Sequence, residues 1–462
     1  EIGVRLVGSE MCIRDSSYGE VGNDGINSSL WSQNWEATSD KRYQGAVNGA
    51  FLPSYSLGAD MANKDLKWET TITRNIGVDF GFFNSRLTGT IDAYWNTTKD
   101  LLMKTAIPGI TGFTSTYANV GQTSNKGIEI ALQGVLVKTR DWNVTAGFNI
   151  NFNRGKVDKL ADNVTGLYGT EWATSSTFPK SDYVLKEGRP VGLVRGLTAD
   201  GFYTTDDFTY ANGVYTLKEG VADVSSAVFP NYHLHNGMNE RPAGQLAYPG
   251  MAKFKDLNDD GIINDDDVDV IGDMTPVHTG GFNINATYKN FDLGLYFNWS
   301  YGNEIYNVNK LAALYGYKEG AVYENKLSIV KDCYKIYDVV NGELVALTTP
   351  EQLNAANANA KLPLAYSENG YVSTLGIEDG SYLRLNTLTL GYTLPKSMLQ
   401  KAGISNLRVY GSIYNVFTIT GYSGIDAEVS TSTSTKTYPQ LGMDWGTYPR
   451  ARSFVLGVNL SF

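Results

Sequence analysis

The last residues of the chain, Ala451–Phe462, read A-R-S-F-V-L-G-V-N-L-S-F and decide its fold. Side chains of an extended strand point alternately to opposite faces. One face of this segment therefore carries the apolar residues Phe454, Leu456, Val458, Leu460 and Phe462. Half-buried strands of soluble proteins can show the same alternation of apolar and polar residues. An alternating segment of about ten residues that ends on an aromatic side chain is, however, typical of the closing strand of an outer-membrane β-barrel.

The same alternation recurs along the chain. In Trp142–Phe152 every second residue is apolar, and the residues between are Asn, Thr or Gly. We predict about nine strands, near residues 67–82, 85–99, 122–138, 141–155, 277–289, 291–306, 381–394, 406–418 and 450–462. Several of these are longer than the five or six residues usual for soluble strands.

The connections between the predicted strands alternate in length. Short turns are expected near residues 83–85, 139–141, 289–290 and 396–405. Long loops are expected at 100–121, 156–276, 307–380 and 419–449. Short turns at one end and long extracellular loops at the other are typical of outer-membrane barrels. We therefore predict an all-β fold, a partial antiparallel transmembrane β-barrel of about 9–11 strands.

Composition agrees with long, half-apolar strands. Of the 462 residues, 19% are charged and 12% aromatic, and the mean hydropathy is −0.24. No apolar run is long enough for a transmembrane helix, and no signal peptide is visible at the N-terminus. The net charge of −10 argues against nucleic acid as a partner. Cys12 and Cys333 are the two cysteines, and we expect no disulfide.

Residues 1–16 match nothing that follows in composition or period. They resemble translated adapter-like runs that contaminate metagenomic assemblies. We expect an artefactual or disordered segment and begin the fold at residue 17.

An acidic stretch at residues 256–267 fits the twelve-residue calcium-loop template. The template assigns side-chain oxygens to positions one, three and five, a glycine to six, a carbonyl to seven, a water-mediated ligand to nine and a carboxylate to twelve. These positions hold Asp256, Asn258, Asp260, Gly261, Ile262, Asn264 and Asp267. Glu is usual at position twelve. We predict a structural Ca²⁺ that stiffens a long external loop; the alternative is a solvated acidic turn without an ion.

Other chemistry is sparse. His233 and His235 form an H-x-H pair, with His278 elsewhere, and we interpret all three as solvated side chains rather than metal ligands. No nucleophile elbow or phosphate-binding loop is present. Carboxylates are common in the loops, but the sequence pairs no two of them as general acid and base. We interpret Trp95, Trp142, Trp299 and Tyr301 as an interfacial girdle rather than a sugar-stacking surface. Thr349–Gln352 is a helix start of the capping-box type, with Leu353–Ala360 following.

Several stretches together resemble one family. They are Leu66–Thr70 with Asn75–Asp79, Asn119–Gly121 with Asn125–Glu129, Glu187–Gly192 with Asp200–Tyr203, Phe254–Gly261, Tyr382–Leu385, Leu390–Pro395, Tyr414–Phe417 and Tyr448–Arg450. Over about residues 17–462 the chain resembles the C-terminal half of SusC/RagA-type TonB-dependent outer-membrane transporters.

The resemblance implies a 22-stranded barrel with an N-terminal plug in the outer membrane of a Gram-negative bacterium. It implies non-enzymatic import of oligosaccharides or peptides, a SusD-like surface lipoprotein as partner and energy from the TonB complex. We expect the plug, the TonB-contacting segment and the first half of the barrel to lie outside this sequence. A curved open sheet with unpaired edges should result, which would not transport alone.

Two other functions remain open at this point. One is a secreted all-β carbohydrate-binding protein or glycosidase with calcium in a loop. The other is a passive porin-like channel, against which the family motifs argue. The first requires the apolar rows to pack against a second protein layer. The positions of Phe148, Leu293 and Val458 therefore separate it from a membrane protein.

Overall fold

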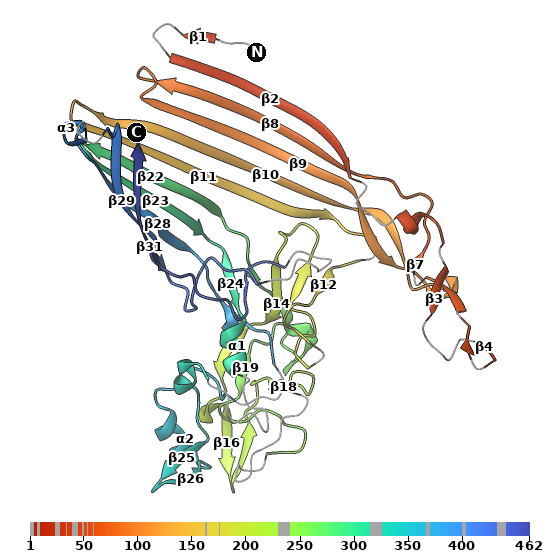
Figure 1. The fold of residues 1–462 in the computed structure, drawn as a ribbon. Helices are drawn as coiled ribbons and strands as arrows, with labels where there is room; N and C mark the ends of the chain where they lie inside the picture. Colours follow the sequence, from red (N-terminus) through yellow and green to blue (C-terminus); the bar gives the residue numbers. More distant parts are fainter. Residues whose placement is uncertain are drawn as a thin grey trace.

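The computed structural model describes residues 4–6, 10–23, 28–33, 35–38, 45–48, 50–52, 54–58, 60–161, 164–174, 176–229, 241–314, 326–365, 370–399, 403–431 and 440–462. A single large curved sheet, here the main sheet, dominates it (Figure 1). Its strands in spatial order are β1 (Val4–Leu6), β2 (Glu10–Asn23), β8 (Glu69–Phe82), β9 (Leu87–Ala106), β10 (Ser115–Lys138), β11 (Trp142–Lys159), β22 (His278–Tyr288), β23 (Phe291–Tyr301), β28 (Tyr382–Thr393), β29 (Asn406–Thr420) and β31 (Ser453–Ser461).

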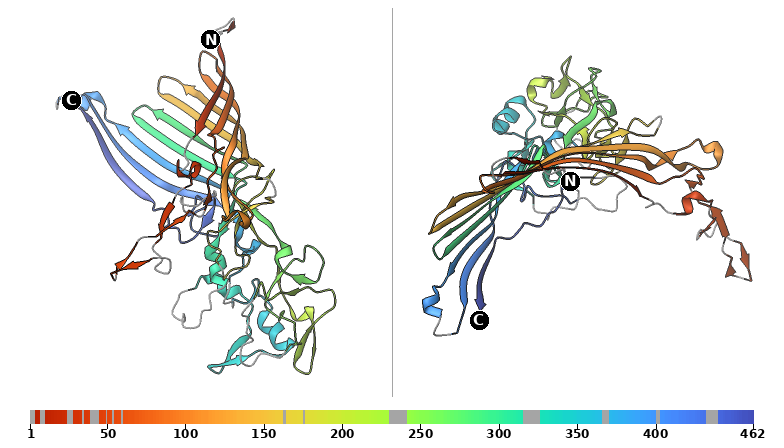
Figure 2. Two further views of the ribbon diagram at one scale, coloured as in Figure 1. Left: turned by 90° about the vertical axis from the view of Figure 1, so that its right-hand side faces the viewer. Right: turned by 90° about the horizontal axis from the view of Figure 1, so that it is seen from above.

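The main sheet is a meander, because each of these strands pairs antiparallel with the next one that joins the sheet. The short strand β7 (Asp60–Met61) adds a parallel pairing to β10. The sheet is strongly curved and open, and the two termini lie at opposite edges (Figure 2). All nine predicted strands are present, and the predicted all-β antiparallel architecture is confirmed.

The strands are joined by tight turns at one end of the sheet. The β8–β9 turn uses left-handed backbone at Phe83, Asn84 and Ser85, and the β22–β23 turn uses it at Lys289. The connection between β28 and β29 contains the short helix α3 (Lys396–Leu399). These turns lie together at the upper left of Figure 1, and the long connections leave the opposite end.

Two predicted boundaries differ from the structure. The expected loop at 100–121 is largely strand, because β9 continues to residue 106 and β10 starts at residue 115. Register shifts between Asn119 and Gly121 and between Gly121 and Thr123 interrupt the two-residue period that the prediction relied on. The strand expected to reach residue 306 ends at Tyr301, since Gly302 turns the chain with φ 76°.

The N-terminal segment also differs from expectation. Residues 10–16 belong to β2, whose pairing with β8 runs from Met11 opposite Gly81 to Asn23 opposite Glu69. Antiparallel pairing uses backbone groups that every residue carries, so the unpaired edge of β8 accepts a strand of unremarkable sequence. The expectation that the fold starts at residue 17 is therefore wrong for this strand. An artefactual origin for residues 1–16 stays a prediction.

A separate module, here the head, is built from the long connections on the far side of the short turns (Figure 1). It contains a four-stranded sheet and several two- or three-stranded ones. Their strands are β12 (Leu167–Gly169), β13 (Tyr183–Leu185), β14 (Leu193–Leu197) and β21 (Val268–Asp273); β15 (Ala199–Phe202) and β19 (Ala252–Phe254); β16 (Phe208–Ala211) and β17 (Val214–Leu217); β18 (Asp223–Val224) and β20 (Ile262–Ile263); β24 (Glu304–Asn307), β27 (Ile377–Asp379) and β30 (Met443–Asp444); β25 (Tyr337–Val340) and β26 (Glu343–Ala346).

The head has its own apolar core. Tyr203, Val228 and Ile263 from the loop after β11 pack in one cluster with Leu353 and Tyr371 from the loop after β23. A hydrogen bond from the Tyr215 hydroxyl to the Thr348 carbonyl, 3.0 Å long, joins the same two loops. The connection after β29 contributes as well, since β30 pairs with β24 and Met443 lies in a second buried cluster with Tyr183 and Tyr306. The head is thus one folded unit made of three insertions.

Two helices belong to the head, α1 (Val308–Leu314) and α2 (Pro350–Asn357). The predicted start of α2 is confirmed, since Thr349 and Gln352 form a capping box with Pro350 in the first turn. The helix ends three residues before the predicted Ala360. In the described part of the chain, no helix is both long and apolar enough to cross a membrane.

Two small strand pairs lie beyond β7, at the right of Figure 1. They pair β3 (Trp35–Thr38) with β6 (Ser54–Leu57), and β4 (Ala46–Val47) with β5 (Ala50–Phe51).

Candidate functional site

The outer face of the main sheet carries apolar side chains in continuous cross-strand rows. One row runs through six neighbouring strands and consists of Ala146, Ile284, Leu295, Leu388, Ile413 and Phe454. The row beside it continues toward the N-terminal edge through Phe148, Leu132 and Phe80, with Gly89 of β9 between the last two. Because strand side chains alternate, the register that aligns one apolar residue aligns all of them on the same face.

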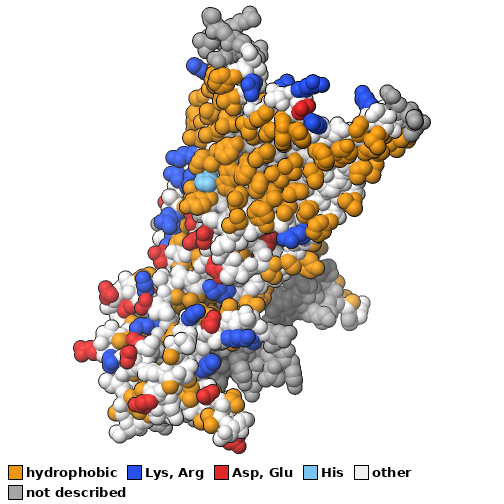
Figure 3. All heavy atoms as spheres, turned by 90° about the vertical axis from the view of Figure 1, so that its left-hand side faces the viewer, with side chains coloured by type: hydrophobic (Ala, Val, Ile, Leu, Met, Phe, Trp, Pro, Cys, Tyr) orange, Lys and Arg blue, Asp and Glu red, His pale blue; other side chains and the backbone are white. Residues whose placement is uncertain are grey.

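No second layer of the described protein covers this face. Phe148 is 39% exposed, Val458 is 61% exposed and Leu293 is partly exposed. Figure 3 shows the apolar side chains as one broad area over the sheet, with charged side chains at its margins and on the head. The terminal residues Phe454, Leu456, Val458, Leu460 and Phe462 are all exposed. An apolar area of this breadth is stable only against another apolar medium, and hydrocarbon is that medium for a half-polar strand.

Aromatic side chains mark both ends of the apolar area. At the short-turn end, Trp142, Tyr288, Phe291 and Tyr392 are in register across four strands. Ring centroids of Trp142 and Tyr288 lie 4.4 Å apart. Toward the head, Trp299 stacks on Phe148 at 5.6 Å, and Tyr301 stacks on His278 at 5.0 Å. Two aromatic zones separated by aliphatic rows are the arrangement expected at two membrane interfaces.

The inner face of the sheet is polar. Tyr296 donates to the Asn285 amide oxygen at 3.0 Å, and the Thr389 and Ser412 hydroxyls lie 2.8 Å apart. Arg408 donates from Nε to Asp292 at 2.8 Å across β23 and β29. Polar groups that pair along the inner wall suit a water-filled interior and not a protein core.

The acidic turn predicted as a calcium site lies at the surface of the head. Asp256 accepts hydrogen bonds from the backbone N–H groups of Asp260 and Gly261, at 3.3 and 2.7 Å. Asn258 accepts from Asp260 N–H, and Asp260 from Ile262 N–H. Gly261 adopts φ 84°, as the sixth position requires. The first, third and fifth positions therefore turn oxygens toward one tight bend.

Position twelve behaves differently. Asp267 is fully buried, and its two carboxylate oxygens accept the N–H groups of Leu257 and Asn264 at 2.7 and 2.8 Å. Asn264 in turn caps the short 3₁₀ segment Asp265–Asp267 by accepting from Asp266 N–H. Asp267 thus closes the turn through hydrogen bonds. The structure brings together Asp256, Asn258 and Asp260. Both carboxylate oxygens of Asp267 are instead used in hydrogen bonds to backbone N–H groups.

In the part of the chain that the structure describes, the acidic turn included, no group of three His, Cys, Asp or Glu side chains is placed to hold a metal ion. His233 and His235 lie outside the described residues. His278 accepts a hydrogen bond from the Trp299 indole at 3.1 Å on the outer face. Cys12 and Cys333 are both free, and burial raises the pKa of the Cys333 thiol to about 11.

A cavity of about 430 Å³ in the head escaped sequence reasoning. Its charged lining residues are Lys180, Arg195 and Asp265. The sequence feature that could have indicated this cavity is Arg195, a charged residue within the otherwise apolar strand Leu193–Leu197. The search for a two-residue period did not distinguish it.

The curved sheet, its apolar outer face and its polar inner face define a membrane β-barrel protein. A family model described as "TonB dependent receptor-like, beta-barrel" matches residues 23–416. TonB-dependent receptor P3 of Formosa agariphila is 30% identical over 456 residues, which are 97% of this chain and 39% of that protein. TonB-dependent receptor SusC of Bacteroides thetaiotaomicron is 29% identical over 408 residues, 87% of this chain and 32% of that protein.

Among solved structures, the RagAB peptide transporter matches with a TM-score of 0.67 and 24% identity, covering 98% of this chain and 41% of the other. This chain belongs to the TonB-dependent receptor-like β-barrel family, a family of outer-membrane transport proteins and not of enzymes. It spans about two fifths or less of the length of these relatives. The alternative of a secreted soluble carbohydrate-binding protein or glycosidase is wrong.

Proposed function

We propose that this chain forms the C-terminal part of the barrel of a TonB-dependent transporter that imports oligosaccharides or peptides across the outer membrane. The observation that carries the proposal is the pair of unlike faces on one sheet: in-register apolar rows outside and hydrogen-bonded polar side chains inside. A wall of that kind separates lipid from an aqueous passage. The family match over residues 23–416 supports energised transport rather than a passive channel.

The partners follow from the same assignment. The head stands at the long-loop end of the wall (Figure 1), where a SusD-like surface lipoprotein would meet it. The TonB complex would act through parts of the protein outside this sequence. The RagAB peptide transporter supports a peptide as substrate. An oligosaccharide is the other substrate class that the resemblance to SusC/RagA-type transporters implies.

The experiment is fractionation followed by uptake. The protein should sediment with outer membranes and show heat-modifiable gel mobility. Cells that carry the complete protein should take up labelled oligosaccharides or peptides, and a protonophore should abolish that uptake. Solubility without detergent would contradict the barrel. Uptake that survives the protonophore would contradict the energised mechanism and favour a passive channel.

We also propose that the acidic turn binds Ca²⁺ through Asp256, Asn258, Asp260 and the Ile262 carbonyl, with Asn264 acting through water and Asp267 closing the loop. The convergence of three side chains on one bend supports this. Hard cations need several oxygens at short range. When bound, the ion would stiffen the surface of the head.

For this site, Asp260→Ala should lose the protection against protease that millimolar Ca²⁺ gives the loop, whereas Asp200→Ala, at an exposed position outside the turn, should keep it. Equal protection of the two variants would contradict calcium binding.

A further inference from the structure

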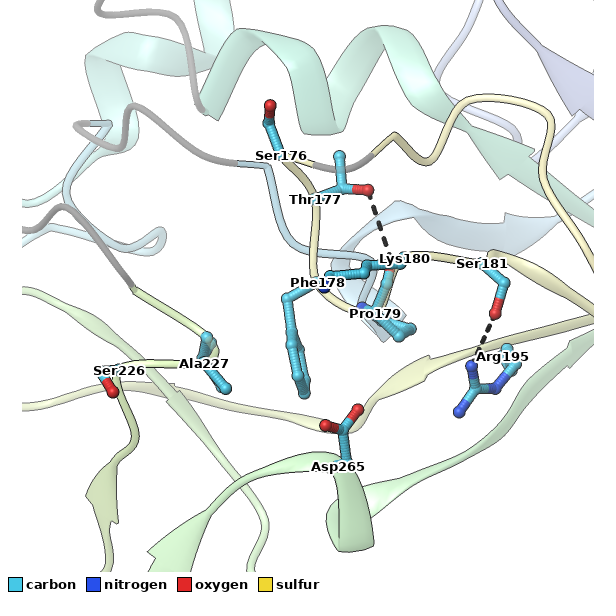
Figure 4. Close-up of a pocket in the computed structure, with 11 residues that line it drawn as sticks. Ser176, Thr177, Phe178, Pro179, Lys180, Ser181, Arg195, Ser226, Ala227 and Asp265 are labelled. Carbon is cyan, nitrogen blue, oxygen red and sulfur yellow. Dashed lines mark hydrogen bonds between the residues drawn. The ribbon is translucent and has the colours of Figure 1, made fainter.

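The cavity in the head has the chemistry of an anion site. It is lined by Phe178, Lys180, Ser181, Arg195, Ser226 and Asp265, among others. These residues come from four separate segments: the stretch at 176–181, strand β14, the residues that follow β18, and the residues that follow β20. Figure 4 shows Arg195 and Asp265 beneath the 176–181 stretch, with the Asp265 carboxylate directed toward it.

Arg195 is held in position without being neutralised. Its Nη1 donates to the Ser181 hydroxyl at 2.8 Å, and its guanidinium lies 4.7 Å from the centre of the Tyr168 ring (Figure 4 draws the hydrogen bond). Within the residues that the structure describes, no carboxylate forms an ion pair with it. A guanidinium has five N–H donors in a planar fork, so most of its hydrogen-bonding capacity stays available.

Arg195 is also partly removed from water. The side chain is half-buried, and burial lowers its pKa, although Tyr168 and Asp265 act in the opposite direction. A desolvated cation that lacks a counter-ion gains more from an incoming anion than an exposed one does. The fork geometry suits a planar carboxylate in particular.

Asp265 limits which anions fit. Its carboxylate lines the same cavity and interacts electrostatically with Arg195. A ligand with a carboxylate alone meets repulsion there. One that carries hydroxyl or ammonium donors beside its carboxylate satisfies both residues.

We propose that this cavity binds the carboxylate of an acidic import substrate, with Arg195 as its main contact and Asp265 as an acceptor for neighbouring donors. The role of the ligand as a substrate rests on the proposed function. A carboxylate of this kind occurs at the C-terminus of a peptide and in a uronic acid, so the experiment separates the two sources.

The test is calorimetric titration of the full chain in detergent micelles with tri-alanine, tri-alanine amide, digalacturonate and its methyl ester. One of the free acids should bind saturably, and its neutral derivative should bind at least about tenfold more weakly. The acid that binds identifies the source. Equal binding of acid and neutral derivative, or no binding of either acid, overturns the inference.

Variants sharpen the result. Arg195→Gln should weaken binding of the acid at least about tenfold, and Arg195→Lys should recover only part of it. Arg189→Gln, at an exposed position that does not line the cavity, removes an equal charge and should leave affinity unchanged. Asp265→Asn should tighten binding of acetate, which has no donors. If Arg195→Gln fails to fold, the Asp265→Asn variant still tests the site, because it is expected to strengthen acetate binding. An acetate affinity equal to that of the wild type would refute the site.

Binding and transport are measured separately. A protein that imports neutral substrates but binds neither acid overturns this inference alone. A protein that binds an acid but does not reach the outer membrane overturns the proposed function alone.

Discussion

Arg384 of β28 and Asp426 of the connection after β29 form an ion pair in which the side chains are only 3% and 6% exposed. Arg384 also donates from Nη1 to Glu428 at 3.0 Å and from Nε to the Thr418 hydroxyl at 3.0 Å. Arg450 joins the same two acids from the other side. The last long connection is therefore fastened to the inner face of the sheet by charge.

Breaking this pair should destabilise the protein strongly. Arg384→Ala leaves Asp426 buried beside one half-exposed cation, which costs about 3–5 kcal/mol. Urea unfolding followed by tryptophan fluorescence measures the change. The matched control is Lys67→Ala, which breaks the exposed pair with Asp100 and should cost about 1 kcal/mol or less. Similar losses in the two variants would contradict a buried role for Arg384.

Charges introduced on the two faces of one strand should have unequal effects. Ile128 lies on the outer face of β10 and Gln133 on the inner face. Ile128→Arg should cost about 2–4 kcal/mol in a bilayer, because it places a cation in hydrocarbon. Gln133→Arg should cost much less. Folding yield into lipid vesicles checks the difference, and equal yields would contradict the assignment of the faces.

Gly280 lies where the sheet has no room for a methyl group. A Cβ there would lie 2.3 Å from the Asn149 carbonyl oxygen and 2.4 Å from the Trp299 ring. Gly280→Ala should therefore shift backbone and lower stability by about 1–3 kcal/mol. Gly134→Ala, whose nearest neighbour would be 3.8 Å away, is the control and should be close to neutral. The temperature at which each variant loses its folded gel mobility measures its stability.

Asp207 should make the head sensitive to acid. Burial alone would raise its pKa, but the Lys253 ammonium at 2.7 Å and the Thr204 N–H outweigh burial and hold the pKa below its ordinary value of 3.8. Its contribution is fully present above that ordinary value and is lost as the pH falls through the lower folded value. Asp207→Asn should cost about 1–2 kcal/mol at neutral pH and nothing in strong acid.

Urea midpoints measured over a range of pH test this, with the neighbouring exposed residue in Asp206→Asn as the control. A difference between wild type and Asp207→Asn that persists in strong acid would show that the carboxylate charge is not responsible.

The barrel wall could be predicted from the sequence because lipid on one side and water on the other impose a period of two on every strand. Positions such as Phe148 and Val458 follow that rule without exception. The rule fails at Gly121, where a bulge shifts the register, and at residues 10–16, whose pairing depends on a free edge more than on side chains.

The head could not be predicted in the same way. Its strands are short, and its core joins residues that lie far apart in the sequence, such as Phe178 and Tyr371. Arg195 and Asp265 come together only through the pairing of β14 with β21. Local periodicity carries no information about such contacts, whereas the match to the calcium-loop template was visible because the residues that match it are close neighbours in the chain.

The shared core of the head couples two stretches that are far apart in the sequence. Tyr203 and Ile263 are buried against Leu353 and Tyr371, and the β22–β23 hairpin lies between the two insertions along the chain. The earlier insertion therefore has no complete interior until the later one is in place beside it. A truncation that stopped the chain after the hairpin would leave these apolar side chains open to water.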